Sequence, residues 1–158
     1  MAIDKDTIGL AGEFAVASEL CKRGIYTQLT LGNKKRTDLL VEKNDSFIKV
    51  EVKSKQGGDW PSIKGIYGKD SILIFVDFQG KAELERPDFY VLNTQNWIAL
   101  TKQRIKDEGW TGVTINNDNT PIWKTSSGKI REGLTVKLKQ IEKFKEAWEK
   151  CLTSKVRL

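Results

Sequence analysis

The segment at residues 71–79, SILIFVDFQ, restricts the fold of this chain more than any other part of the sequence. Apolar residues follow one another there almost without interruption, which is typical of a β-strand that is covered on both faces. Such a strand needs packing partners above and below it. A chain of 158 residues is long enough to bury a core of this kind, most simply as one domain over residues 1–158.

Patterns on either side of this segment supply the rest of a sheet and the helices that cover it. Alternation and turn signals predict four further strands, at 25–31, 37–43, 47–54 and 88–93. Apolar residues at helical spacing predict three helices, at 4–23, 94–109 and 136–152. The glycine-rich segment 56–70 is expected to be a loop, and 111–133 is polar with turn signals. This order of elements indicates an α/β or α+β fold, with helices packed on a sheet.

The sequence contains no histidine, and this absence excludes several kinds of chemistry. Ser–His and Cys–His nucleophiles, histidine-based zinc sites and histidine general acid–base mechanisms all require an imidazole. Cys21 and Cys151 lie in predicted helices and cannot complete a four-ligand zinc site without histidine. We expect both to be buried, reduced thiols, with a disulfide as the alternative. An enzyme of this composition must work with carboxylates, lysines and a hard cation.

Charge and hydropathy indicate where such a protein would act. No apolar run approaches the length of a membrane span, and the first residues, MAIDKDTIGL, contain acids where a signal peptide has a basic start. We therefore expect an untargeted, cytoplasmic protein without a membrane partner. Lys and Arg together number 27 against 21 acids, a formal charge of +6, which is compatible with a polyanionic partner.

The segment at 37–55, TDLLVEKNDSFIKVEVKSK, combines strand-forming residues with acids and lysines. Alternation places Glu51 and Lys53 on the same face of the second strand. A two-residue turn at Asn44–Asp45 would place Asp38 directly opposite Glu51. A shift of the turn by one full pair would place Asp38 opposite Lys53 instead, and a three-residue loop would break the alignment.

Asp38 and Glu51 would then lie about 5 Å apart, where two carboxylates repel each other unless a cation lies between them. Mg²⁺ binds hard oxygen ligands at ~2.1 Å and takes one or two carboxylates together with phosphate oxygens and waters. A bound divalent ion lowers the pKa of its water, and Lys53 can stabilise the charge that develops on the phosphorus. This pattern therefore indicates a metal site that hydrolyses a phosphodiester. The alternative is the solvated face of a charged hairpin.

Two further features favour the metal site. Glu13 lies beside the apolar stripe of the first helix and could face the sheet, where a carboxylate is costly unless it is paired or bound to metal. The alternative for Glu13 is a glutamate at the edge of the stripe that reaches solvent. Basic segments, NKKR at 33–36 and KSK at 53–55, flank the acids on both sides. A basic rim suits nucleic acid, because acids alone would repel its phosphates.

Glu13 in a first helix, Asp38 at the opening of a strand and Glu-Val-Lys at 51–53 in the next strand together resemble the PD-(D/E)XK nuclease superfamily over residues 12–56. The resemblance implies an α/β fold with a restriction-endonuclease-like central mixed β-sheet flanked by helices. It also implies a DNA endonuclease in which Asp38 and Glu51 bind Mg²⁺ or Mn²⁺. Lys53 would assist the water, and Glu13 would be an accessory acid. Thr37 stands where the named motif has proline, a position that commonly varies in the family.

DNA is the partner that this interpretation implies. We expect contacts to nucleic acid from the residues of the basic flanks and their neighbours: Lys34, Lys35, Arg36, Lys55, Gln56 and Lys64. Cutting both strands of a duplex needs two sites related by symmetry, so we expect a homodimer, with Phe144 and Trp148 of the last helix as a candidate contact. Trp60, in the expected loop, either stacks on a base or packs in the core.

Two other classes of function are open at this point. The first is a nucleic-acid-binding module that keeps the fold without catalysis. Retention of all four candidate groups argues against it, because a site freed from chemistry has no reason to keep buried acids. The second is a basic protein-interaction domain.

Overall fold

The computed structural model describes residues 2–30 and 36–152. Its helices are α1 (Lys5–Lys22), α2 (Thr94–Asp107), α3 (Leu138–Ile141) and α4 (Glu149–Leu152), with a 3₁₀ helix η1 (Glu142–Phe144). Its strands are β1 (Thr27–Leu29), β2 (Leu39–Lys43), β3 (Ser46–Lys55), β4 (Trp60–Ile63), β5 (Ser71–Asp77), β6 (Asp88–Asn93), β7 (Val113–Ile115), β8 (Pro121–Lys124), β9 (Ile130–Glu132) and β10 (Leu134–Val136).

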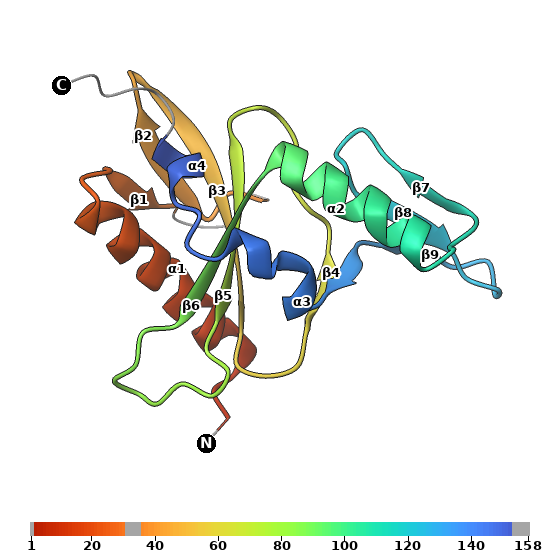
Figure 1. Cartoon of the computed structure of the whole chain (residues 1–158), viewed down its shortest axis with the longest axis horizontal. Helices are drawn as coiled ribbons and strands as arrows, with labels where there is room; N and C mark the ends of the chain where they lie inside the picture. The colour runs from red at the N-terminus through yellow and green to blue at the C-terminus, as the bar shows by residue number, and fades with distance from the viewer. Residues whose placement is uncertain (1, 31–35, 153–158) are drawn as a thin grey trace.

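Five strands form a central sheet in the order β1-β2-β3-β5-β6 (Figure 1). β3 and β5 run parallel, and the other neighbours in this sheet are antiparallel. A parallel pair needs a crossover connection, and segment 56–70, which contains β4, provides it. The central mixed sheet with helices packed on it confirms the predicted α/β fold.

Strand β5 is covered on both faces, as its apolar run predicts. Ile72, Ile74 and Val76 pack in the hydrophobic cluster that contains α1. Leu73 and Phe75 alternate with them and pack in a second cluster, which contains α2. Figure 1 shows these two helices on opposite sides of the sheet.

The turn between β2 and β3 fixes the register of their hairpin. Asn44 and Asp45 both have positive φ, 46° and 61°, as expected of a two-residue type I′ turn. Lys43 then pairs with Ser46, and the ladder continues to Leu39, opposite Val50. This is the register that the two-residue turn predicts, and it makes Asp38 the first residue beyond the paired part of β2.

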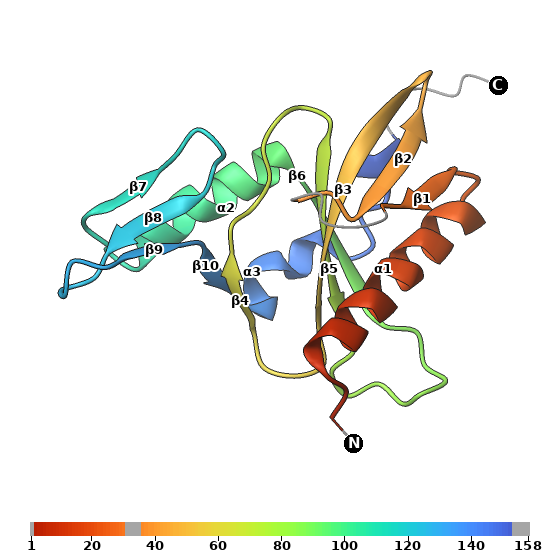
Figure 2. The same ribbon diagram turned by 180° about the vertical axis from the view of Figure 1, so that it is seen from behind.

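Two smaller sheets lie beyond the central sheet (Figure 2). β4 pairs with β10, and β7, β8 and β9 form an antiparallel sheet. The expectation that 56–70 is only a loop is therefore wrong. Trp60 in β4 is 1% exposed, packs edge-on against Phe75 and donates its Nε1–H to Lys53 O at 3.0 Å. Of the two alternatives for Trp60, the structure has core packing rather than a free ring for base stacking.

The last predicted helix, 136–152, is broken into pieces. Phe144 packs in the cluster that contains α2, whereas Trp148 packs in the cluster that contains α1. One straight helix cannot serve both faces of a sheet, so the chain leaves helical geometry at Glu146 (φ 54°), whose N–H donates to Phe89 O at 2.9 Å. Phe144 and Trp148 are 8% and 4% exposed, so the expected dimer contact through these side chains is wrong.

The two cysteines are free thiols, and the alternative of a disulfide does not apply. Cys151 is buried as expected, but Cys21 is exposed. Among the residues that the structure describes, no helix is long and apolar enough to cross a membrane.

Candidate active site

The carboxylate of Asp38 lies where β2 parts from β3. The backbone N–H of Asp38 donates to Val50 O at 2.9 Å, and Asp38 Oδ2 accepts a hydrogen bond from the backbone N–H of Val52 at 2.7 Å. The side chain thus takes over the role of a strand partner and is fixed at the edge of β3, beside Glu51. The structure therefore brings together the two acids that the hairpin register predicts to be neighbours.

Glu51 is only 4% exposed. Its Oε1 forms an ion pair with Lys53 Nζ at 2.8 Å, whereas its Oε2 is buried and has no hydrogen-bond partner among the described residues. Burial raises the pKa of Glu51, the charge of Lys53 acts in the opposite direction, and the charge of Asp38 raises the pKa further. A solvated hairpin face would leave this acid in water, so that alternative does not describe Glu51.

Glu13 approaches the same place from helix α1. Gly12 is buried against β3, and a Cβ there would lie 1.8 Å from Ser54 Oγ, so any larger residue would push α1 away from the strand. The next residue, Glu13, is half-buried. Burial raises its pKa, the charge of Asp38 raises it further, and the charge of Lys53 lowers it. The Glu13 carboxylate is thus within electrostatic reach of both of these side chains.

The oxygen atoms at this place suit a small divalent cation. Mg²⁺ and Mn²⁺ prefer hard oxygen ligands, and for Mg²⁺ one or two carboxylates are enough when phosphate oxygens and waters complete the shell. Glu51 Oε2 is a buried oxygen without a partner in the described part of the chain, and Asp38 has a second oxygen besides the one bonded to β3. Across residues 2–30 and 36–152, no three acids or cysteines are gathered closely enough to hold an ion by themselves. The residues therefore fit a cation shared with a phosphate rather than one enclosed by the protein.

Two of the residues that we expected to contact DNA form hydrogen bonds within the protein instead. Lys55 is 6% exposed, and its Nζ donates to Asp77 Oδ1 at 2.9 Å and to Gln79 Oε1 at 2.7 Å. A lysine held inside the fold cannot reach a phosphate at the surface, so we correct the expectation for Lys55. Gln56 follows β3 directly and accepts a hydrogen bond from Ile3 N at 3.0 Å.

The other expected contacts lie at the surface or beyond the described residues. The lysines at 34 and 35 are outside the described residues. Lys64 is half exposed and pairs with Glu132 at 2.9 Å. Arg36 is held by a distant turn, because its Nη2 donates to Thr120 Oγ1 at 3.0 Å. No local sequence pattern pointed to Thr120, which lies 84 residues further along the chain.

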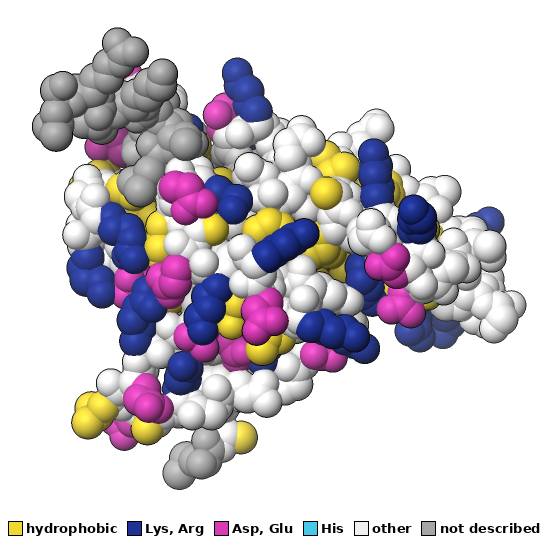
Figure 3. Space-filling view, viewed as in Figure 1, with side chains coloured by type: hydrophobic (Ala, Val, Ile, Leu, Met, Phe, Trp, Pro, Cys, Tyr) yellow, Lys and Arg dark blue, Asp and Glu magenta, His cyan; other side chains and the backbone are white. Residues whose placement is uncertain are grey.

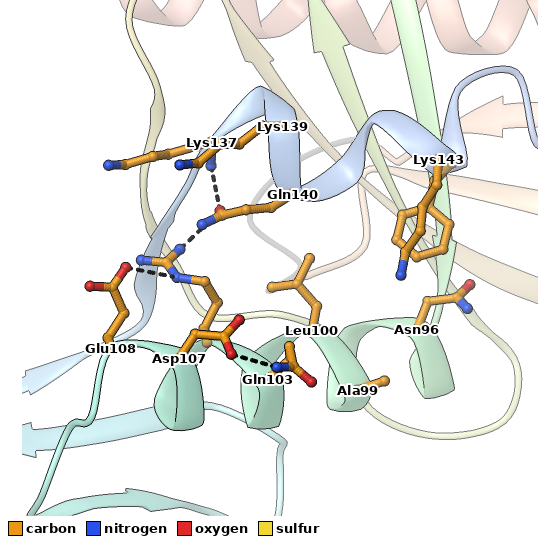
Figure 4. Close-up of a pocket in the computed structure, with 12 residues that line it drawn as sticks. Asn96, Ala99, Leu100, Gln103, Asp107, Glu108, Lys137, Lys139, Gln140 and Lys143 are labelled. Atoms are coloured by element: carbon orange, nitrogen blue, oxygen red, sulfur yellow. Dashed lines mark hydrogen bonds and ion pairs between the residues drawn. The ribbon is translucent and has the colours of Figure 1, made fainter.

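A cavity of about 720 Å³ lies between α2 and the segment of α3 and η1 (Figure 4). Leu100 and Phe144 contribute apolar surface to it, and three lysines come from the α3–η1 side: Lys137, Lys139 and Lys143. None of the site residues expected from the sequence lines this cavity. The candidate active site is the place on β3 where β2 parts from it, not this cavity.

The charge on the face of the molecule shown in Figure 3 is distributed rather than concentrated. Lysines and arginines lie there beside aspartates and glutamates, without one large area of a single sign. The formal charge of +6 does not gather on that face. The candidate site adds positive charge of its own, because Arg36 and Lys53 lie close to the acids there.

Comparison with known proteins adds a fold but not a family. The chain matches no protein-family model, and no curated protein matches it in sequence. Among solved structures, it is similar to the bacterial homing endonuclease I-Ssp6803I, with a TM-score of 0.51 and 17% sequence identity over 96% of this chain and 93% of that chain. The two chains therefore share a fold along almost their whole lengths. Membership of the PD-(D/E)XK superfamily stays a prediction.

Proposed function

We propose that this chain is a metal-dependent DNA endonuclease that hydrolyses phosphodiester bonds through Asp38, Glu51 and Lys53. The observation that carries the proposal is the buried Glu51 carboxylate, with one oxygen paired to Lys53 and the other without a hydrogen-bond partner among the described residues. Burying a charged carboxylate with one oxygen unpaired costs free energy unless a further positive charge lies beside that oxygen. The fold shared with a bacterial homing endonuclease supports the proposal by analogy, because the same fold carries an endonuclease site in that protein.

Each residue has a separate role in this proposal. Asp38 and Glu51 hold Mg²⁺ or Mn²⁺ with their carboxylate oxygens. Such a cation, when bound, lowers the pKa of a water and neutralises charge on the phosphate. Lys53, whose side chain is 37% exposed, keeps an ammonium beside Glu51 and donates to the phosphate oxygen on which charge develops. Glu13 is the accessory acid, which orients a water through a hydrogen bond.

A homodimer is part of the proposal, because a duplex cut on both strands requires two copies of the site related by symmetry. Burial of Phe144 and Trp148 means that the contact uses other residues. Sedimentation at micromolar concentration, with and without DNA, measures the oligomeric state. A monomer under both conditions would reject the dimer and leave single-strand nicking as the activity.

A second candidate, a nucleic-acid-binding module without catalysis, is favoured by one contact. The ion pair between Lys53 and Glu51 at 2.8 Å already neutralises one of the acids. In such a module the pair would persist and no cation would bind. Calorimetric titration of Mn²⁺ into a complex of the protein with a short duplex, corrected for the duplex by itself, separates the two candidates, because the phosphates complete the shell of the cation. Binding that is lost in Glu51→Gln supports the enzyme, whereas no binding to the wild type supports the module.

A digestion panel tests the activity and identifies the class of substrate. Linear, branched and single-stranded DNA are each incubated with the protein and Mg²⁺ or Mn²⁺, with RNA as a comparison. We expect at least one DNA form to be cut and a chelator to stop the reaction. DNA that stays intact under every condition would refute the proposed function.

A further inference from the structure

Arg36 is held in one position by residues from two distant segments. Its Nη2 donates to the hydroxyl of Thr120, a residue with no exposed surface, at 3.0 Å. Its guanidinium carbon lies 5.7 Å from the centre of the Tyr67 ring, and Nη1 lies 3.8 Å from Asp118 Oδ2. The residue itself has a positive φ of 56°, an uncommon conformation for a side chain of this size. A surface arginine that only contributed net charge would not need such support.

One donor of this guanidinium has no acceptor among the residues that the structure describes. Arg36 Nη1 is buried and forms no hydrogen bond with any described residue, since the 3.8 Å to Asp118 is too long for one. A guanidinium is always charged and always a donor, so it cannot become neutral to relieve this state. The fold therefore fixes a cationic N–H group that needs an acceptor from outside the described chain.

Arg36 lies beside the candidate active site. It precedes Asp38 by two residues, and Asp38 Oδ2 is fixed to β3. Burial is the largest influence on the pKa of Glu51 and raises it, while the charge of Arg36 is among the influences that lower it. Within residues 2–30 and 36–152, neither Glu51 Oε2 nor Arg36 Nη1 has a hydrogen-bond partner, so the two atoms are not bonded to each other. One ligand with several acceptor oxygens could accept a hydrogen bond from the arginine. The same ligand could bind a cation that the glutamate also binds.

We infer that the Arg36 guanidinium, whose side chain is 21% exposed, donates from Nη1 to a non-bridging oxygen of the phosphate in the active site once a small rotation uncovers that atom. A phosphate diester supplies the acceptor that the guanidinium lacks, through a short, charge-assisted hydrogen bond. This inference rests on the proposed function and deepens it, because it makes Arg36 a substrate-binding residue with a fixed place. Thr120, Tyr67 and Asp118 are then positioning residues that hold the guanidinium ready.

Salt dependence of DNA binding tests the contact without cleavage. Binding of a random-sequence duplex in Ca²⁺ is measured at several salt concentrations for wild type, Arg36→Gln and Thr120→Val. Each lost phosphate contact makes the negative slope of log K against log salt shallower by about 0.9. We expect that change in Arg36→Gln, while Thr120→Val, which keeps the charge and removes only its support, should retain the wild-type slope. A wild-type slope in Arg36→Gln would overturn the inference.

Thermal unfolding and plasmid cleavage separate substrate binding from a structural role. If Arg36 only anchored the turn at 116–120, both variants would lower the melting temperature equally and neither would change the salt dependence. That pair of results would overturn the inference. We expect Arg36→Gln to slow plasmid cleavage by on the order of a hundredfold, the scale of one lost transition-state contact. If the wild type cuts no DNA with Mg²⁺ or Mn²⁺, the proposed function fails, but the slope still decides whether Arg36 binds phosphate.

Discussion

Replacing Gly12 with alanine should weaken the packing of α1 on β3, whereas the same change at Gly9 should not. A Cβ at Gly12 would lie 1.8 Å from Ser54 Oγ and 3.0 Å from Ser54 Cβ. A Cβ at Gly9 would meet nothing within 4 Å. Because both glycines lie inside α1, Gly9→Ala is a matched control for the change in helix propensity.

The expected difference follows from two opposing effects. Alanine stabilises a helix interior by roughly 1 kcal/mol relative to glycine, and both variants gain this. Overpacking a core costs about 1–3 kcal/mol, and only Gly12→Ala has this cost. Its free energy of unfolding should therefore be about 1–3 kcal/mol below that of Gly9→Ala. Ser54 Oγ can rotate away from the new methyl group, but Ser54 Cβ cannot.

Urea unfolding of a double-mutant cycle measures this contact. Ser54→Ala removes the hydroxyl that the new methyl group would strike, and it costs little by itself because the buried Oγ has no hydrogen-bond partner among the described residues. Gly12→Ala should be less destabilising in that background by about 1 kcal/mol. Equal stabilities of Gly9→Ala and Gly12→Ala would refute the close approach of α1 to β3, and with it the basis for placing Glu13 in the site.

Two further predictions concern stability and thiol chemistry. The Arg86 guanidinium, which donates twice to Glu19 at 2.9 Å, holds the pKa of that carboxyl well below its usual value, so its stabilisation is present at neutral pH and lost as pH falls. Glu19→Gln should lower the free energy of unfolding by about 2 kcal/mol at pH 7 and by less at pH 3, and a constant difference would contradict this. Burial raises the pKa of Cys151 to about 12, whereas Cys21 is exposed. A thiol reagent should label one cysteine in the native protein and two in urea, and two fast reactions would show that Cys151 is accessible.

Local features of the fold could be predicted from the sequence because their determinants are short in range. Helix α1 begins one residue after the predicted start at 4, because Asp4 caps it by accepting a hydrogen bond from the backbone N–H of Thr7. The Asn44–Asp45 turn set the hairpin register because a two-residue turn leaves only one pairing. The apolar run at 71–77 likewise predicts a strand that is buried on both faces, because the pattern lies in neighbouring residues.

Contacts between distant segments could not be predicted in this way. The charged flank 53–55 suggested that Lys55 lies at the surface, but the parallel register of β3 with β5 pairs it with Asp77 inside the fold. The apolar spacing of 136–152 fits one helix, but the residues divide between two faces of the sheet. Arg36 reads as part of a basic loop until its contact with Thr120, 84 residues away, is known. Local patterns carry no information on such pairings.

Cleavage by site variants tests the central claim most directly. Plasmid cleavage with Mg²⁺ or Mn²⁺ and duplex binding are measured in parallel for each protein, with Glu42→Gln, an exposed acid on the same hairpin, as the control. Asp38→Asn and Glu51→Gln should abolish cleavage while DNA binding persists or tightens, because each change removes repulsion between a carboxylate and phosphate. Lys53→Ala should slow cleavage by on the order of a hundredfold or more, and Glu13→Gln should have a smaller effect. Wild-type cleavage by Asp38→Asn and Glu51→Gln, or no cleavage by the wild type with any metal, would contradict the nuclease site.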